Sequence, residues 1–200
     1  MMKYLALILV FLVIGSNCQI VIKEKCPDVT VQQNFDTKKW SGTWYLVEAY
    51  STSFLQSEKC VDLLITQFPN KTVGLQLTTF NIETNDQSRT DGRVNHIGPN
   101  GDGKLSGYLN GTFYVTSILE TDYENYSVDW TCQKETDETN DAIVWILTRT
   151  PNPSDEIRDK YHNVLDRNGI SRKYLHPVEQ KDCPKRVENN THYRSIKNEF

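Results

Sequence analysis

The sequence has only one long apolar run, and that run lies at the N-terminus. Lys3 precedes an unbroken apolar stretch from Tyr4 to Ile14, and small residues lead from there to Cys18. This pattern is typical of a signal peptide, so we expect residues 1–18 to be removed on export. The run is too short to span a bilayer and no second one follows, so we expect no transmembrane segment.

The mature chain has no excess of basic residues. Loss of Lys3 lowers the count of Lys and Arg from 22 to 21 against 26 Asp and Glu, which gives a formal charge of −5. No basic patch stands out, so we expect no nucleic-acid partner. We expect residues 19–200 to form one domain, with a flexible tail of mixed charge at 185–200.

Cysteine is scarce, and none of it occurs in CxxC pairs. We therefore expect no metal site. Once Cys18 has left with the signal peptide, the cysteines are even in number: Cys26, Cys60, Cys132 and Cys183. In an exported chain they predict two disulfides, for which three pairings are open. Four sequons agree with export and predict glycosylation at Asn70, Asn110, Asn125 and Asn189.

Catalytic patterns are also missing. The histidines are scattered, and the sequence has neither a Ser/His/Asp arrangement nor a Gly-rich phosphate loop. Because the cysteines of the mature chain are expected in disulfides, no thiol is left to act as a nucleophile. We expect no enzymatic activity.

The mature chain does contain a regular series of short β-like runs. They are rich in Val, Ile, Leu, Thr and aromatic residues, and turn residues such as Pro69-Asn70 and Asn110-Gly111 separate them. Such a meander predicts a closed antiparallel barrel or a sandwich. The runs are Thr43–Tyr50, Cys60–Phe68, Thr72–Phe80, Arg89–Ile97, Lys104–Leu109, Thr112–Leu119, Asn125–Gln133 and Ala142–Thr148.

One helix is predicted after these strands. Ser154 suits the N-cap position and Asn168-Gly169 ends the helical pattern. A short extended piece is expected at Arg172–Leu175. The apolar residues of the helix fall on one face, which needs a sheet to cover: Ile157, Tyr161, Val164 and Leu165.

Three separated motifs then point to one fold. Gly42-Thr43-Trp44-Tyr45 opens the first run, Thr121-Asp122-Tyr123 follows the sixth, and Arg149 ends the eighth. In order and strand position they resemble the signature of the lipocalin family. The resemblance implies an all-β fold, an eight-stranded antiparallel up-and-down β-barrel with the C-terminal helix packed on its outside. In that fold Arg149 packs over Trp44, and the turn closes the base of the barrel. It implies structural roles for Gly42, Trp44, Thr121, Asp122, Tyr123 and Arg149.

Within the family, the chain is most similar to the group of apolipoprotein D and the insect bilin-binding proteins. The resemblance covers roughly residues 26–184 and is poorest at 81–110, where the strand register is uncertain. By analogy, the disulfides are Cys26–Cys132 and Cys60–Cys183. The similar stretches are Cys26-Pro27, Asn34-Phe35-Asp36, Thr121–Tyr126, Ala142–Asn152 and Asp182-Cys183-Pro184.

Strand alternation then assigns the inner face of the barrel. Cys132 bonds a segment outside the barrel, so Trp130 and Val128 point outward with it and Asp129 points inward. Glu48 is placed inward by the same argument. A carboxylate there is costly, so Asp129 either lies near the wet mouth, the interpretation we favour, or faces a polar or cationic ligand. The predicted ligand-binding residues are Trp145, Tyr50, Leu63, Leu75, Leu77, Tyr114, Ile118, Asp129 and Ile143.

These expectations describe a secreted, extracellular carrier of a small hydrophobic ligand. Candidates are a fatty acid, a sterol, a retinoid or a bile pigment such as biliverdin, carried as cargo, with no cofactor required. Two alternatives stay open. One is a scavenger of a small cationic amine, motivated by Asp129 and Glu48. The other is a protein-interaction role through the open-end loops, without a dedicated ligand. A cell-surface receptor or a lipoprotein is a further candidate partner.

Overall fold

A computed structural model describes residues 20–22, 25–50, 55–134, 136 and 138–185. The predicted signal peptide, the sequon at Asn189 and all of the predicted tail beyond Lys185 lie outside these residues. None of the helices within the described ranges is long and apolar enough to cross a membrane.

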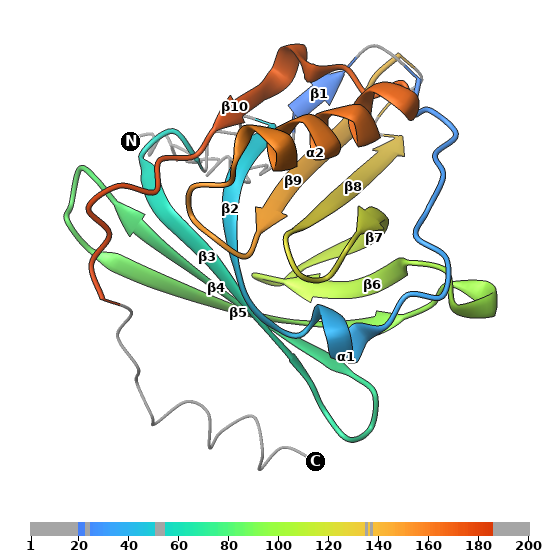
Figure 1. Cartoon of the computed structure of the whole chain (residues 1–200), viewed down its shortest axis with the longest axis horizontal. Coiled ribbons are helices and arrows are strands. Elements are labelled where there is room, and N and C mark those ends of the chain that lie inside the picture. Colours follow the sequence, from blue (N-terminus) through green and yellow to red (C-terminus); the bar gives the residue numbers. More distant parts are fainter. Residues whose placement is uncertain (1–19, 23–24, 51–54, 135, 137, 186–200) are drawn as a thin grey trace, which may run out of the picture.

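Eight antiparallel strands form a closed barrel, as the sequence predicts (Figure 1). Each strand pairs with the next one in the chain, and the eighth pairs back with the first, which closes the sheet. The predicted runs are confirmed, with bounds that shift by a few residues. The strands are β2 (Gly42–Tyr50), β3 (Glu58–Gln67), β4 (Val73–Asn81), β5 (Gln87–His96), β6 (Lys104–Leu109), β7 (Thr112–Thr121), β8 (Tyr126–Lys134) and β9 (Asn140–Thr148).

The barrel has two different ends. The start of β2 and the turns after β3, β5 and β7 lie at one end, which we call the base; a short helix, α1 (Thr37–Trp40), lies there too (Figure 1). A 3-10 turn, η2 (Pro99–Gly101), joins β5 to β6 at the base. The turns after β4, β6 and β8 lie at the opposite end, which we call the open end.

Two short strands extend the sheet beyond the barrel. β1 (Ile20–Ile22) pairs with β9, and β10 (Leu175–Pro177) pairs with β2. The expected extended piece at Arg172–Leu175 is corrected, because Arg172–Tyr174 forms a 3-10 turn, η3, and the strand begins only at Leu175. Strands of three residues show too little alternation to be found in a sequence.

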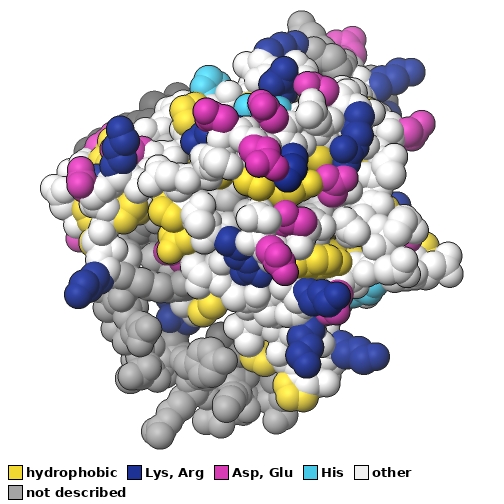
Figure 2. Space-filling view, in the orientation of Figure 1, with side chains coloured by type: hydrophobic (Ala, Val, Ile, Leu, Met, Phe, Trp, Pro, Cys, Tyr) yellow, Lys and Arg dark blue, Asp and Glu magenta, His cyan; other side chains and the backbone are white. Residues whose placement is uncertain are grey.

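The predicted helix is α2 (Asp155–Arg167), and it lies across the outside of the barrel (Figure 1). The Ser154 hydroxyl accepts a hydrogen bond from the Ile157 amide and caps the helix. Its buried residues Tyr161, Val164 and Leu165 pack in one cluster with outward side chains of β8 and β9. Figure 2 shows acidic and basic side chains intermixed on the solvent side of this face.

A β-bulge in β2 overturns two predictions. The pairing of β2 with β9 shifts between Leu46 and Glu48, so one extra residue reverses the alternation beyond that point. Tyr50 therefore lies outside the barrel wall, where its ring packs on Trp130 and Tyr174 and its hydroxyl donates to the Ser171 carbonyl at 2.8 Å.

Glu48 lies on the same outer side, under α2. It accepts hydrogen bonds from the Tyr161 hydroxyl at 2.7 Å and the His162 ring at 2.9 Å, and Arg158 Nη1 lies at 3.3 Å. The predictions that Tyr50 and Glu48 face the cavity are wrong, because neither alternation nor composition reveals a bulge.

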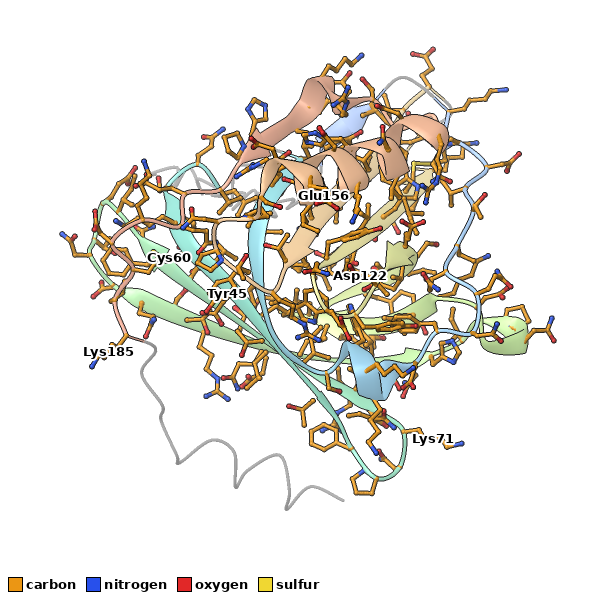
Figure 3. The ribbon with its side chains drawn as sticks, in the orientation of Figure 1. Tyr45, Cys60, Lys71, Asp122, Glu156 and Lys185 are labelled. Carbon is orange, nitrogen blue, oxygen red and sulfur yellow. A yellow bond between two sulfur atoms is a disulfide. The ribbon has the colours of Figure 1, made fainter. Side chains whose placement is uncertain are left out.

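Two disulfides join the ends of the chain to the barrel. Cys26 bonds Cys132 on β8, and Cys183 bonds Cys60 on β3, which are the pairings that the resemblance implies. In Figure 3 the labels Cys60 and Lys185 mark where the C-terminal segment passes the barrel wall. Each bond closes a loop of more than one hundred residues, so each contributes about 2–5 kcal/mol to stability.

Candidate functional site

The base of the barrel is held together by the guanidinium of Arg149. This residue follows β9 directly, and its guanidinium carbon lies 3.6 Å from the centre of the Trp44 ring. The side chain thereby joins β2, the segment before it and the turn after β7. Its nitrogens donate to four backbone carbonyls at 3.0–3.2 Å: those of Lys39, Ser41, Thr43 and Tyr123.

Gly42 leaves room for this contact. Its φ is +109°, and a Cβ atom there would lie 3.0 Å from Arg149 Nη1. Both the backbone conformation and the close approach favour glycine. Trp44 is fully buried, and its indole N–H donates to the Trp40 carbonyl at 2.7 Å.

The turn after β7 satisfies its own polar groups. The Thr121 hydroxyl donates to the Tyr126 carbonyl at 2.6 Å and accepts from the Tyr123 amide at 2.9 Å. Asp122, labelled in Figure 3, accepts from three backbone amides at 2.7–3.1 Å. Burial raises the pKa of the Asp122 carboxyl, but these bonds and one from the Asn125 amide group outweigh it and lower the pKa. These contacts are structural, and they close the base of the barrel.

Above the base, the barrel encloses a cavity that is open at the other end. The empty space of the cavity, with its mouth included, is about 1050 Å³. Trp40 from α1 lies at its floor, and Leu109 and Asn110 of the β6–β7 hairpin lie at its mouth. Apolar and aromatic side chains dominate the wall. Seven predicted ligand-binding residues line it: Leu63, Leu75, Leu77, Tyr114, Asp129, Ile143 and Trp145.

Two predicted ligand-binding residues do not line the cavity. Tyr50 lies outside the barrel because of the bulge in β2. Ile118 is fully buried inside the barrel, but it belongs to the apolar cluster near the base and contributes no surface to the cavity. Alternation predicts its face correctly but says nothing of its depth.

Among the described residues, Asp129 is the one acidic or basic side chain on the cavity wall. Its side chain accepts a hydrogen bond from the Ser127 hydroxyl at 2.7 Å, and the Trp40 indole N–H donates to that hydroxyl at 3.1 Å. Burial raises the pKa of the Asp129 carboxyl to about 7, and the bond from Ser127 only partly opposes this. Asp129 is 7% exposed and pairs with Trp145 and Ile118, three residues from the base end of β8. The interpretation that places Asp129 near the wet mouth is therefore wrong.

Comparison with known proteins agrees with this architecture. The sequence profile of the Lipocalin / cytosolic fatty-acid binding protein family matches residues 41–182. The chain belongs to the lipocalin family. Apolipoprotein D of Mus musculus is 31% identical over 80% of this chain and 85% of its own length. The bilin-binding protein of Pieris brassicae is 23% identical over 82% of this chain and 87% of its own length.

The fold agrees with that of solved lipocalin structures. Insecticyanin from the tobacco hornworm Manduca sexta superposes with a TM-score of 0.70 over 82% of this chain and 90% of that one, at 19% identity. At this level of identity the likeness shows the fold alone.

Sequence reasoning missed a second part of the lipocalin cavity. Trp40 precedes the first predicted strand, so alternation did not reach it, although it stands beside the Gly42-Thr43-Trp44 motif. β5 and β6 lie where the register was uncertain, so no inward residue was assigned there. The missed lining residues include Trp40, Thr90, Val94 and Leu105.

The described part of this lipocalin offers little for metal binding or nucleophilic chemistry. Its His, Cys, Asp and Glu side chains form no group of three or more that could hold a metal ion. All four cysteines within the described ranges are in disulfides, which leaves no free thiol there.

Proposed function

We propose that this lipocalin is a secreted carrier that holds one small hydrophobic molecule inside its barrel. The observation that carries the proposal is the cavity, which has a largely apolar wall, one open end and a base closed by the Arg149 contacts. Sites of this kind bind small molecules by burying their apolar surface while a few polar groups set the orientation. A fatty acid, a sterol, a retinoid and a bile pigment are the candidate classes.

The chemistry of the cavity supports this cargo. A ligand that buries about 300 Å² of apolar surface gains roughly 7 kcal/mol before the costs of association. Trp145 and Tyr114 add ring surfaces to the wall. Among the relatives, the bilin-binding protein is named for a bilin, which supports a pigment as one candidate.

Several features support export. The N-terminal sequence has the pattern of a signal peptide, and the two disulfides suit an oxidising compartment. The sequon residues Asn70, Asn110 and Asn125 are exposed. A glycan on Asn110 would stand beside the mouth of the cavity.

The test is to express the full chain in secreting cells, purify it from the medium and identify what it carries. Extraction with organic solvent and mass spectrometry should find one small hydrophobic molecule per protein, and visible absorbance would select a pigment. Retention of the chain inside the cells would overturn secretion. A barrel that is empty and takes up no hydrophobic compound would overturn the carrier.

A matched pair of variants locates the binding to the cavity. Thr90→Trp places a large ring among the lining residues, whereas Asn95→Trp places the same ring on the outer face of the same strand. We expect the first variant to bind the identified ligand at least about tenfold more weakly and the second to bind it as the wild type does. Equal affinity for the two variants would place the ligand outside the barrel.

A further inference from the structure

The inner face of β8 carries a line of polar side chains along a largely apolar cavity. Ser127, Asp129 and Thr131 alternate on this face. The Thr131 hydroxyl lies 2.9 Å from the hydroxyl of Thr116 on β7, and Ser127 is engaged by Trp40 and Asp129. The hydroxyl groups therefore have hydrogen-bond partners within the wall. The carboxyl of Asp129 can still accept further hydrogen bonds.

Asp129 lacks the donors that a buried carboxylate needs. Among the described residues, the Ser127 hydroxyl is the one donor to this carboxyl, and it bonds Oδ1. No Lys, Arg or His lines the cavity in the described part of the chain. A buried carboxylate without a counterion is strongly destabilised. The second oxygen of Asp129 therefore faces the cavity without a protein partner there.

The position of Asp129 sets where a partner group would lie. Lys134 at the open end lies five positions further along β8 than Asp129, a distance of about 17 Å at about 3.3 Å per residue. A ligand whose body fills the apolar part of the cavity would bring one of its ends to the carboxyl.

We propose that Asp129 anchors a cationic nitrogen, so that the cavity selects an amphiphilic amine with a hydrophobic body and one protonated amino group. This inference rests on the proposed function, since it requires a cavity that holds a hydrophobic molecule. The ammonium group pairs with the free oxygen of Asp129, and the hydroxyl of Thr131, the next inward side chain of β8, accepts a further N–H bond. A charged hydrogen bond of this kind in a dry site contributes more than a neutral one. Glu48, the other carboxylate first considered for such a role, is engaged outside the barrel by α2.

Binding of an amine at Asp129 should depend on pH. Among the described lining residues, the other titratable groups are the phenols of Tyr108 and Tyr114, so Asp129 sets the charge at the site. Burial raises the pKa of Asp129 to about 7 in the empty protein. The amine needs the ionised carboxylate, so its affinity falls by up to about tenfold for each pH unit below 7.

The experiment measures the binding of three probes that share one chain and differ only in the end group: dodecylamine, dodecanol and dodecanoic acid. Calorimetric titration of the full protein at pH 8 is expected to show dodecylamine binding at least about tenfold more tightly than the other two. Asp129→Asn should abolish this preference, because the amide keeps the shape and can still accept the bond from Ser127 but carries no charge. Glu48→Gln removes the same charge outside the cavity and should leave the preference unchanged.

The outcomes separate the inference from the function on which it rests. If none of the three probes binds but another hydrophobic compound does, the amine inference fails and the carrier function stands; if no hydrophobic compound binds at all, the carrier function itself fails. If dodecanol or dodecanoic acid binds as tightly as dodecylamine, or if Asp129→Asn keeps the preference, the carrier function stands and the inference that Asp129 selects an amine is wrong. If Asp129→Asn does not fold, the pH dependence of binding to the wild-type protein provides the test. Dodecylamine affinity that falls from pH 8 to pH 5, while dodecanol affinity stays constant, supports the inference, and a flat profile for both overturns it.

Discussion

The base and the cavity of this barrel differ in how completely the fold pairs their charged groups. At the base, the Arg149 guanidinium donates to four carbonyls and covers Trp44, and the Asp122 carboxylate accepts from three backbone amides. In the cavity, Asp129 has one donor and no counterion among the described residues. Charges whose partners are all supplied by the fold stabilise it, whereas an incompletely paired charge in a cavity is a site that a ligand can complete.

Removal of the Arg149 side chain tests the role of paired charge at the base and should have the largest effect on stability. Arg149→Ala leaves four carbonyls without their donor and uncovers Trp44, so we expect a loss of roughly 4 kcal/mol in unfolding free energy, measured by urea denaturation. Arg149→Lys keeps the charge but lacks the planar guanidinium with its several donors, so it should recover less than half of the stability lost in Arg149→Ala. A loss below about 1 kcal/mol for Arg149→Ala would show that the base does not depend on this residue.

Removal of the Asp129 charge should act in the opposite direction. The pKa of Asp129 rises from its ordinary 3.8 to about 7 on folding, so the unfolded chain ionises first and stability falls as the pH rises from about 4 to about 7. Asp129→Asn does not titrate, so the empty variant should be more stable than the wild type by roughly 2–4 kcal/mol at pH 8. The gain should vanish below about pH 4, where both states are protonated. Urea denaturation across this range measures it, and a variant less stable than the wild type at pH 8 would contradict the comparison.

A substitution at Gly42 tests how closely the base is packed. Gly42→Ala adds a Cβ 3.0 Å from Arg149 Nη1 at a φ of +109°, so we expect a loss of about 2 kcal/mol. Gly111→Ala provides the control, since it also has positive φ but no atom within 4 Å of the added Cβ. Equal losses in thermal or urea denaturation would attribute the whole effect to the backbone and none to the contact with Arg149.

The contact between Glu48 and α2 should give the smallest change. Glu48→Gln keeps the shape but weakens the bonds from Tyr161 and His162, so we expect a loss of about 1 kcal/mol. Hydrogen exchange should show the loss as faster exchange in α2, with the strands at the base unchanged. Uniformly faster exchange across the barrel would mean that α2 and the base are not separate units.

The fold was largely predictable because it rests on local patterns. Alternation and turn residues mark the eight strands, and Ser154 and Gly169 mark the ends of the helix region. The face of Asp129 followed from Cys132, since no bulge separates the two residues along β8. Tyr50 was misplaced because the bulge before Glu48 depends on the pairing with β9, which no single strand encodes.

The rest of the cavity was not predictable for a related reason. The depth of a residue depends on how strands are staggered around the barrel, so sequence could not distinguish Ile118 in the lower cluster from Thr116 on the cavity wall. The one donor to Asp129 among the described residues is Ser127 of β8, whose hydroxyl in turn accepts a bond from Trp40 of α1, and this arrangement became visible only when both elements were placed.

The charge state of Asp129 can be followed by titration of its carboxyl in carbon-13 NMR, with Asp129→Asn to assign the signal. In the empty protein we predict a pKa of about 7, raised by burial. With saturating dodecylamine the pKa should fall well below that value, because the bound cation favours the carboxylate. An Asp129 pKa near 4 in the empty protein, unchanged by dodecylamine, would contradict the account.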